Sequence, residues 1–189
     1  MPEIERIGMI ARWRPVHLGH AAVLRALSSA AREVVVGIGS SNRYDIRSPF
    51  TAEEAADMIR LVLERRSNVR LVLVPDLDNG PRWRDMVVEM LGPLDLFVTD
   101  NAYVASLLDG RYSIARPLSL VPESERFPVD GTLVRREMAR GDRWKDLVPP
   151  QVAAYIEARH LEARFRREFG LATLALETQA GGAHVYLGR

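Results

Sequence analysis

Short apolar runs alternate with longer segments of helical periodicity through the first 120 residues of the chain. The apolar runs predict strands, and Glu33–Ser40 is rich in β-branched residues. Apolar positions three and four apart predict the helices that lie between the strands. The predicted strands are Arg6–Trp13, Glu33–Ser40, Arg70–Val74, Asp95–Thr99 and Tyr112–Leu118. The predicted helices are His20–Arg32, Thr51 to about Arg66, Trp83–Leu91 and Tyr103–Leu108.

This order of elements predicts a parallel sheet. Strands about 25 to 35 residues apart with helices between them are typical of βαβ units, whose crossovers are right-handed. We therefore expect an α/β fold: a doubly wound, Rossmann-like parallel sheet of about five strands with a C-terminal helical segment. Ligands are expected at the carboxyl ends of the strands.

Beyond residue 120 the pattern changes to a loop and then to further helices. Helical spacing covers about Thr132–Arg140 and Pro149–Phe169, whereas the last twenty residues contain a Gly-Gly pair and little periodicity. The prediction is one domain over residues 1–169, with its helical part at about 131–169, and a flexible tail or appendage over 170–189.

Composition narrows the class of protein. The chain has 189 residues, is 47% hydrophobic, carries 26 basic against 25 acidic side chains and contains no cysteine. Disulfides, thiol nucleophiles and thiolate metal sites are therefore excluded. The balanced charge argues against a nucleic-acid partner. Since no apolar stretch approaches ~20 residues and the start has no signal-peptide pattern, we expect no membrane association and a cytoplasmic protein.

The strongest chemical signal is the stretch RWRPVHLGH that follows the first predicted strand. A helix is expected to begin near His20, and the amino end of a helix offers unpaired N–H groups to an anion. His17 and His20 add hydrogen-bond donors beside it, and Gly19 permits close approach of the backbone. The pattern favours a phosphate site over the alternative that the two histidines only cap the turn.

Four motifs in order resemble those of archaeal-type nicotinamide-nucleotide adenylyltransferases, within the (H/T)xGH nucleotidyltransferase superfamily. They are ARWRPVHLGH, GIGSSNRYDIRSPFT, PDLDNGPRW and DGTLVRREMARGDRWKDLVP. Together they extend over about residues 6 to 165 of the chain. The resemblance is therefore specific and covers nearly the whole predicted domain.

The resemblance implies transfer of AMP from ATP to the 5′-phosphate of nicotinamide mononucleotide or nicotinate mononucleotide. The products would be NAD or its deamido form, and pyrophosphate. It further implies Mg²⁺ held mainly by the ATP phosphates, with no metal site on the protein, and a homo-oligomer. The attacking phosphate is already an oxyanion, so the reaction needs positioning and electrostatic stabilisation rather than a general base.

The resemblance also assigns roles to individual residues. The catalytic set is His17, His20, Arg12 and Arg47, with His20 nearest the α-phosphate. The ATP-binding set is Gly19, Gly37, Gly39, Thr132, Arg135 and Arg136. The acceptor-binding set is Asp78, Asn79, Trp83 and Asn101, with Trp83 stacked on the nicotinamide ring.

Each weaker assignment has a simpler alternative. Arg47 alone reads as an exposed loop charge, and one of Arg135 and Arg136 is expected on the solvent face. Trp83 could be a core aromatic, and glycines within a strand more often mark a bulge or bend.

Several residues depart from the pattern of the family: Ala11, Arg14, Ala55, Asp100 and Asp130. An added arginine at position 14 favours a more anionic acceptor, so the acceptor stays open. Two further hypotheses remain at this point. One is a nucleotidyltransferase with another phosphorylated acceptor or a preference for CTP, and the other is a non-catalytic protein that binds or senses nucleotides.

Overall fold

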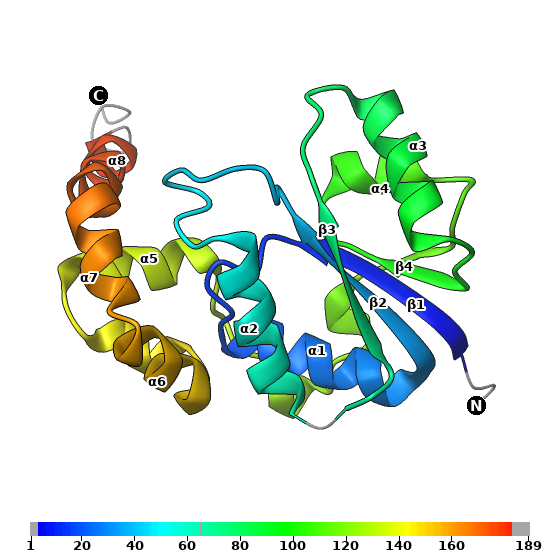
Figure 1. The fold of residues 1–189 in the computed structure, drawn as a ribbon, viewed down its shortest axis with the longest axis horizontal. Helices are drawn as coiled ribbons and strands as arrows, with labels where there is room; N and C mark the ends of the chain where they lie inside the picture. The colour runs from blue at the N-terminus through cyan, green and yellow to red at the C-terminus, as the bar shows by residue number, and fades with distance from the viewer. Residues whose placement is uncertain (1–3, 65, 183–189) are drawn as a thin grey trace, which may run out of the picture.

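The computed structural model describes residues 4–64 and 66–182. Its centre is a parallel sheet with the strand order β3-β2-β1-β4-β5 (Figure 1). The strands described are β1 (Ile4–Ala11), β2 (Ala31–Gly39), β3 (Val69–Val74), β4 (Leu96–Val98) and β5 (Ile114–Ala115). This topology confirms the doubly wound parallel sheet.

Helices cover both faces of the sheet (Figure 1). Helices α1 (Leu18–Ala30) and α2 (Ala52–Leu63) lie on one face, and α3 (Gly80–Leu91) and α4 (Ala102–Leu108) lie on the other. Successive residues of β2 point to opposite faces of the sheet. Val34 and Val36 belong to the larger core under α1 and α2, and Val35 belongs to the smaller core under α3 and α4. The run of valines is therefore buried on both faces, as in other parallel sheets.

Polar side chains in the loops after the strands cap the amino ends of α2, α3 and α4. Thr51 closes a capping box with Glu54: its Oγ1 accepts from the Glu54 N–H at 3.2 Å, and its own N–H donates to Glu54 Oε2 at 2.9 Å. Asn79 and Asn101 cap α3 and α4 with their side-chain oxygens. These caps fix where each helix begins relative to the carboxyl edge of the sheet.

The C-terminal part forms a group of helices beside α2 (Figure 1). It contains α5 (Gly131–Arg140), a 3₁₀ segment over Arg143–Leu147, α6 (Pro150–Ala158), α7 (Leu161–Phe165), a π turn over Arg166–Gly170 and α8 (Leu171–Gly182). The single helix predicted over Pro149–Phe169 is wrong, because His160 adopts a left-handed conformation with φ 53° and separates α6 from α7.

The predicted tail is also partly helical. Leu171–Gly182 forms α8, which packs against α5. Residues 183–189 of the predicted tail lie outside the described residues, and the domain boundary at residue 169 stays a prediction. Within the described part of the chain, no helix combines the length and apolar character needed to cross a membrane.

Candidate active site

Two cavities meet at the carboxyl ends of β1 and β4, where the strand order reverses direction. The histidine cavity, about 690 Å³, is lined by His17, Gly19 and His20 together with the loop before α5. The aromatic cavity, about 350 Å³, lies between α3 and α4 and is lined by Trp83 and Tyr103. Both are also lined by Ile10, Ala11, Arg12, Thr99 and Asn101. In open α/β sheets, this switch point is the expected ligand position.

His17 holds the turn that leads into α1. It is the N-cap residue, and its Nδ1 accepts a hydrogen bond from the backbone N–H of His20 at 3.2 Å. A neutral ring that accepts at Nδ1 carries its proton on Nε2, which leaves a donor for a ligand. Gly19 makes the turn possible, because a Cβ there would lie 3.2 Å from both His17 Nδ1 and the Val129 carbonyl oxygen. His17 therefore both caps the helix and lines the cavity.

His20 lies against two other rings. Its imidazole stacks on that of His17, with centroids 3.6 Å apart and planes 21° apart, and it contacts Trp13 with centroids 4.7 Å apart. Its Nδ1 is buried and has no hydrogen-bond partner within the described residues. A buried polar atom without a partner is rare in proteins and is expected to find one in a ligand or water.

Both imidazoles are neutral at pH 7. Burial lowers the pKa of His17 to about 4, and the charge of Asp130 opposes the shift in part. Burial also lowers the pKa of His20 well below its usual range, and His17 lowers it further. Since burial disfavours the charged form, the pair can donate hydrogen bonds to an anion without carrying charge of its own.

The positive charge of the site comes from arginines. Arg135 reaches back from α5 and donates from Nη1 to the carbonyl of Arg14 at 3.2 Å and from Nη2 to Thr132 Oγ1 at 3.4 Å. Burial lowers the pKa of Arg135, and the charges of Arg12 and Arg47 lower it further. Mutual repulsion of this kind is relieved when an anion binds between the groups.

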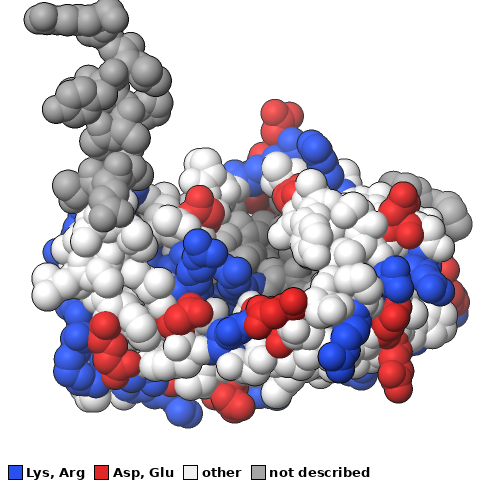
Figure 2. Space-filling model, turned by 90° about the horizontal axis from the view of Figure 1, so that it is seen from above, with Lys and Arg blue, Asp and Glu red and all other residues white. Residues whose placement is uncertain are grey.

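Arg12 and Arg47 are exposed, and within the described residues neither side chain forms a salt bridge. The space-filling view shows both basic and acidic side chains on the border of a hollow near the middle of the molecule (Figure 2). Arg12 and Arg47, which form no salt bridge with the described residues, favour an anionic ligand.

A third cavity, about 290 Å³, adjoins α5. It is lined by Arg47, Thr132, Arg135 and Arg136 together with residues of α8. We call it the arginine cavity. Arg47 is an exposed loop residue, which agrees with the alternative that it is a surface charge, but it also lines this cavity. The expectation that one of Arg135 and Arg136 faces only solvent is wrong, since both are half-buried and line it.

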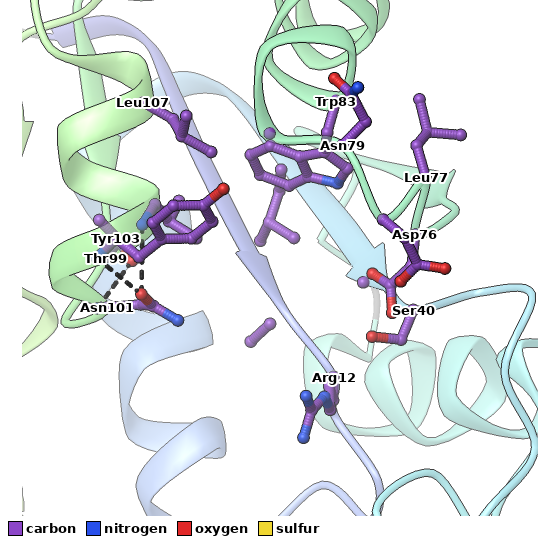
Figure 3. Close-up of a pocket in the computed structure, with 16 residues that line it drawn as sticks. Arg12, Ser40, Asp76, Leu77, Asn79, Trp83, Thr99, Asn101, Tyr103 and Leu107 are labelled. Carbon is purple, nitrogen blue, oxygen red and sulfur yellow. Dashed lines mark hydrogen bonds between the residues drawn. The ribbon is translucent and has the colours of Figure 1, made fainter.

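The four predicted acceptor residues all line the aromatic cavity (Figure 3). The Asn79 and Asn101 side-chain oxygens cap helices, so their amide nitrogens are the groups left for a ligand. The Asp78 carboxylate pairs with Arg43 at 2.6 Å on the rim. Trp83 is half-buried and packs against the smaller core, so it is a core aromatic that also presents a face to the cavity.

The structure places Gly37, Gly39 and Arg14 differently from the predictions. Gly37 lines none of the cavities described here. A Cβ there would lie 2.6 Å from Ile10 Cγ1 and 3.1 Å from Val74 Cγ2, so the residue is packed within the sheet. Gly39 lines the aromatic cavity beside the predicted acceptor residues and does not line the histidine cavity, contrary to its place in the predicted ATP-binding set. Arg14 is 2% exposed and donates to the carbonyls of Arg43 and Gly39, so its guanidinium does not contact the cavity proposed for the acceptor.

The other departures from the family pattern have separate structural roles. Asp130 is the N-cap of α5 and accepts from the Leu133 N–H at 2.8 Å. Asp100 lines the histidine cavity, Ala11 lines the wall shared by the two cavities, and Ala55 is buried in the larger core.

Sequence reasoning missed Thr99 and Tyr103. Thr99 directly follows β4 and lines both cavities, and its place after a predicted strand could have indicated it. Tyr103 lies in the first turn of α4. The sequence pointed to this region only through Asn101, which lies in the loop between β4 and α4.

Comparison with known proteins agrees with this geometry. Residues 11–137 match the family model described as Cytidylyltransferase-like. The nicotinamide-nucleotide adenylyltransferase of Methanococcus maripaludis is 32% identical over 154 residues, covering 80% of this chain and 88% of that protein. The enzyme of the same name from Aeropyrum pernix is 33% identical over 171 residues, covering 87% of this chain and 97% of that protein.

The fold also matches a solved structure. A bifunctional NMN adenylyltransferase/ADP ribose pyrophosphatase from Francisella tularensis superposes with a TM-score of 0.75 at 15% identity. The match covers 96% of this chain and 57% of that longer one. From the family model and the relatives together, the chain belongs to the cytidylyltransferase-like nucleotidyltransferases, in the family of nicotinamide-nucleotide adenylyltransferases.

Proposed function

We propose that the protein transfers AMP from ATP to the 5′-phosphate of nicotinamide mononucleotide or nicotinate mononucleotide. The observation that carries the proposal is the meeting of two cavities at one wall. Arg12 belongs to both cavities, and the two neutral histidines line the larger one. This arrangement would bring two phosphorylated ligands together at the end of β1. The names of the relatives support the same chemistry.

ATP is proposed to occupy the histidine cavity. Its adenosine would lie toward the apolar wall that includes Leu118 and Phe127, which are exposed in the structure. Its α-phosphate would accept hydrogen bonds from the rings of His17 and His20. The β- and γ-phosphates would reach the start of α5, where unpaired N–H groups and the Arg135 guanidinium face the arginine cavity.

The reaction on this geometry is an in-line displacement. An oxygen of the acceptor phosphate forms the new bond to the α-phosphorus, and the bond from that phosphorus to the bridging oxygen breaks to release pyrophosphate. The arginine forks would match phosphate oxygens bidentately and balance charge on the leaving group. The neutral imidazoles would stabilise charge on the α-phosphate without repelling the arginines.

Magnesium is proposed to enter with ATP. Within the described residues, no group of three or more histidine, aspartate or glutamate side chains is placed to hold a metal ion. Asp100 and Asp130 are the carboxylates on the wall of the histidine cavity, and Asp130 is engaged as the N-cap of α5. Mg²⁺ prefers oxygen ligands and keeps several waters, which the ATP phosphates and solvent would supply. The residues present therefore fit an ion held by the phosphates of the substrate.

The test is turnover of purified protein with ATP, Mg²⁺ and a set of acceptors, monitored by pyrophosphate release and by dinucleotide formation. The expected result is release with nicotinamide or nicotinate mononucleotide. Release only with another acceptor, or only when CTP replaces ATP, would support the second hypothesis. Nucleotide binding without release on any acceptor would support the non-catalytic one. A cytoplasmic location and a homo-oligomeric assembly stay predictions.

A further inference from the structure

Tyr103 is an aromatic residue whose exposure needs a reason. It is 62% exposed, whereas Trp83 on the wall of the same cavity is half-buried. Its backbone is fixed, since its N–H donates to Asn101 Oδ1 at 3.0 Å in the first turn of α4. Its hydroxyl makes no hydrogen bond to any residue that the structure describes. The ring is thus held in place by its helix while its face and hydroxyl are available to a ligand.

Trp83 lies across the cavity from Tyr103 (Figure 3). Trp83 comes from α3 and Tyr103 from α4, and both rings point into the space between the helices. The two rings do not pack against each other, although other aromatic pairs of the described chain do. The two rings thus border the aromatic cavity from different helices.

Gly80 sets how closely Tyr103 approaches α3. A Cβ at Gly80 would lie 2.2 Å from the Tyr103 hydroxyl oxygen and 3.2 Å from Leu107 Cδ2. The absence of a side chain at this position therefore lets the hydroxyl end of the tyrosine rest against the start of α3. Any side chain there would turn the ring away from its present place.

Resting on the proposed function, we propose that Tyr103 is the second wall of a slot for the acceptor's base. The pyridinium ring of the acceptor mononucleotide would lie between Trp83 and Tyr103, in stacked and cation–π contact with both. The Tyr103 hydroxyl would donate to the exocyclic carbonyl of the ring. Because the slot is built from two π faces, it selects a flat, cationic ring over a neutral, puckered one. Reduced nicotinamide mononucleotide, whose ring is a neutral dihydropyridine, should therefore bind more weakly.

The test compares three variants with the unchanged protein. Tyr103→Ala removes the ring, Tyr103→Phe removes only the hydroxyl, and Gly80→Ala displaces the ring while leaving it present. Alanine is the better helix former, so Gly80→Ala should not weaken α3. Leu73→Ala is the matched control, since it truncates an exposed apolar residue that lines neither cavity.

Two measurements are made on each variant. The first is the separate KM for nicotinamide mononucleotide and for ATP, together with kcat. The second is quenching of tryptophan fluorescence by nicotinamide mononucleotide. Trp13 and Trp144 are both 0% exposed, so quenching on contact with the ligand reports Trp83.

The expected result is a rise of about tenfold in the acceptor KM of Tyr103→Ala, with the ATP KM within about twofold. The quenching midpoint should rise by the same factor, and the preference over reduced nicotinamide mononucleotide should shrink. Gly80→Ala should show a smaller change of the same kind, and Leu73→Ala none.

An acceptor KM and quenching midpoint that stay within about twofold in Tyr103→Ala would overturn the role of Tyr103. Equal rises in both KM values would overturn it as well, because they indicate a general structural defect. Absence of turnover and quenching in the unchanged protein would instead contradict the proposed function itself.

Discussion

The buried histidine at the start of α1 makes stability depend on pH in a defined window. His17 is 7% exposed, and burial lowers its pKa from 6.5 to about 4. In the unfolded chain the imidazole binds a proton at higher pH than in the folded protein. Stability that is present above the unfolded pKa is therefore lost as the pH falls from about 6.5 to about 4.

The magnitude follows from the size of the shift. A difference of about 2.5 pKa units at about 1.4 kcal/mol per unit gives a total loss of about 3.4 kcal/mol. About 2 kcal/mol of this should already be lost at pH 5. The pKa of His20 is lowered in the same direction, so its contribution adds to the loss in the same window.

The perturbation that isolates the effect is His17→Asn. Asparagine is a good N-cap residue whose side-chain oxygen can accept from the His20 N–H, but it does not titrate. Urea unfolding of both proteins at pH 7 and pH 5 gives the two free energies of unfolding. Acidic side chains that change protonation in this range contribute to both proteins and cancel in the comparison.

The variant should lose about 2 kcal/mol less than the unchanged protein between pH 7 and pH 5. His160→Asn, which replaces an exposed histidine, should lose as much as the unchanged protein. If His17→Asn lost as much stability with acid as the unchanged protein, burial of a neutral imidazole at the turn would be refuted.

Three further substitutions test the site and the sheet. His20→Ala should reduce turnover by at least about tenfold with an unchanged circular dichroism spectrum. A variant with the full rate would show that the reaction does not take place at His20. Arg135→Lys keeps the charge but loses the planar fork, so the KM for ATP should rise by about tenfold, and an unchanged KM would exclude bidentate contact. Gly37→Ala should cost about 1–3 kcal/mol in urea unfolding because its Cβ meets Ile10 and Val74, without altering either KM. Unaltered stability would contradict that packing.

The features that were predictable from the sequence are those determined by residues close together along the chain. The valine run of β2 is apolar at consecutive positions, which only a strand covered on both faces can bury. Thr51 and Glu54 form their capping box within four residues of chain. The turn at Gly19 likewise depends mainly on neighbours in sequence, although the Val129 carbonyl also approaches it.

Features that depend on distant parts of the chain were not predictable. Arg14 follows the first strand as a phosphate-binding arginine would, but its acceptors are carbonyls of Gly39 and of the loop after it. Nothing in the sequence around His160 marks a helix break, since neither glycine nor proline is present there. Helix α8 has no apolar periodicity that reveals its contact with α5.

Tyr103 shows the same limit at the site itself. Its distance from Asn101 in sequence is short, but its role depends on Gly80 and Trp83, which reach it from a different helix. The resemblance assigned a role to Asn101, two residues away, but it assigned none to Tyr103, which lies outside the four motifs.

The most direct measurement is a crystal structure with a non-hydrolysable ATP analogue and nicotinamide mononucleotide. We predict an α-phosphate oxygen within ~3 Å of a ring nitrogen of His17 or His20. The outer phosphates should contact Thr132 and Arg135 at the start of α5. A triphosphate bound away from this turn, with neither imidazole touching it, would contradict the proposed nucleotide site.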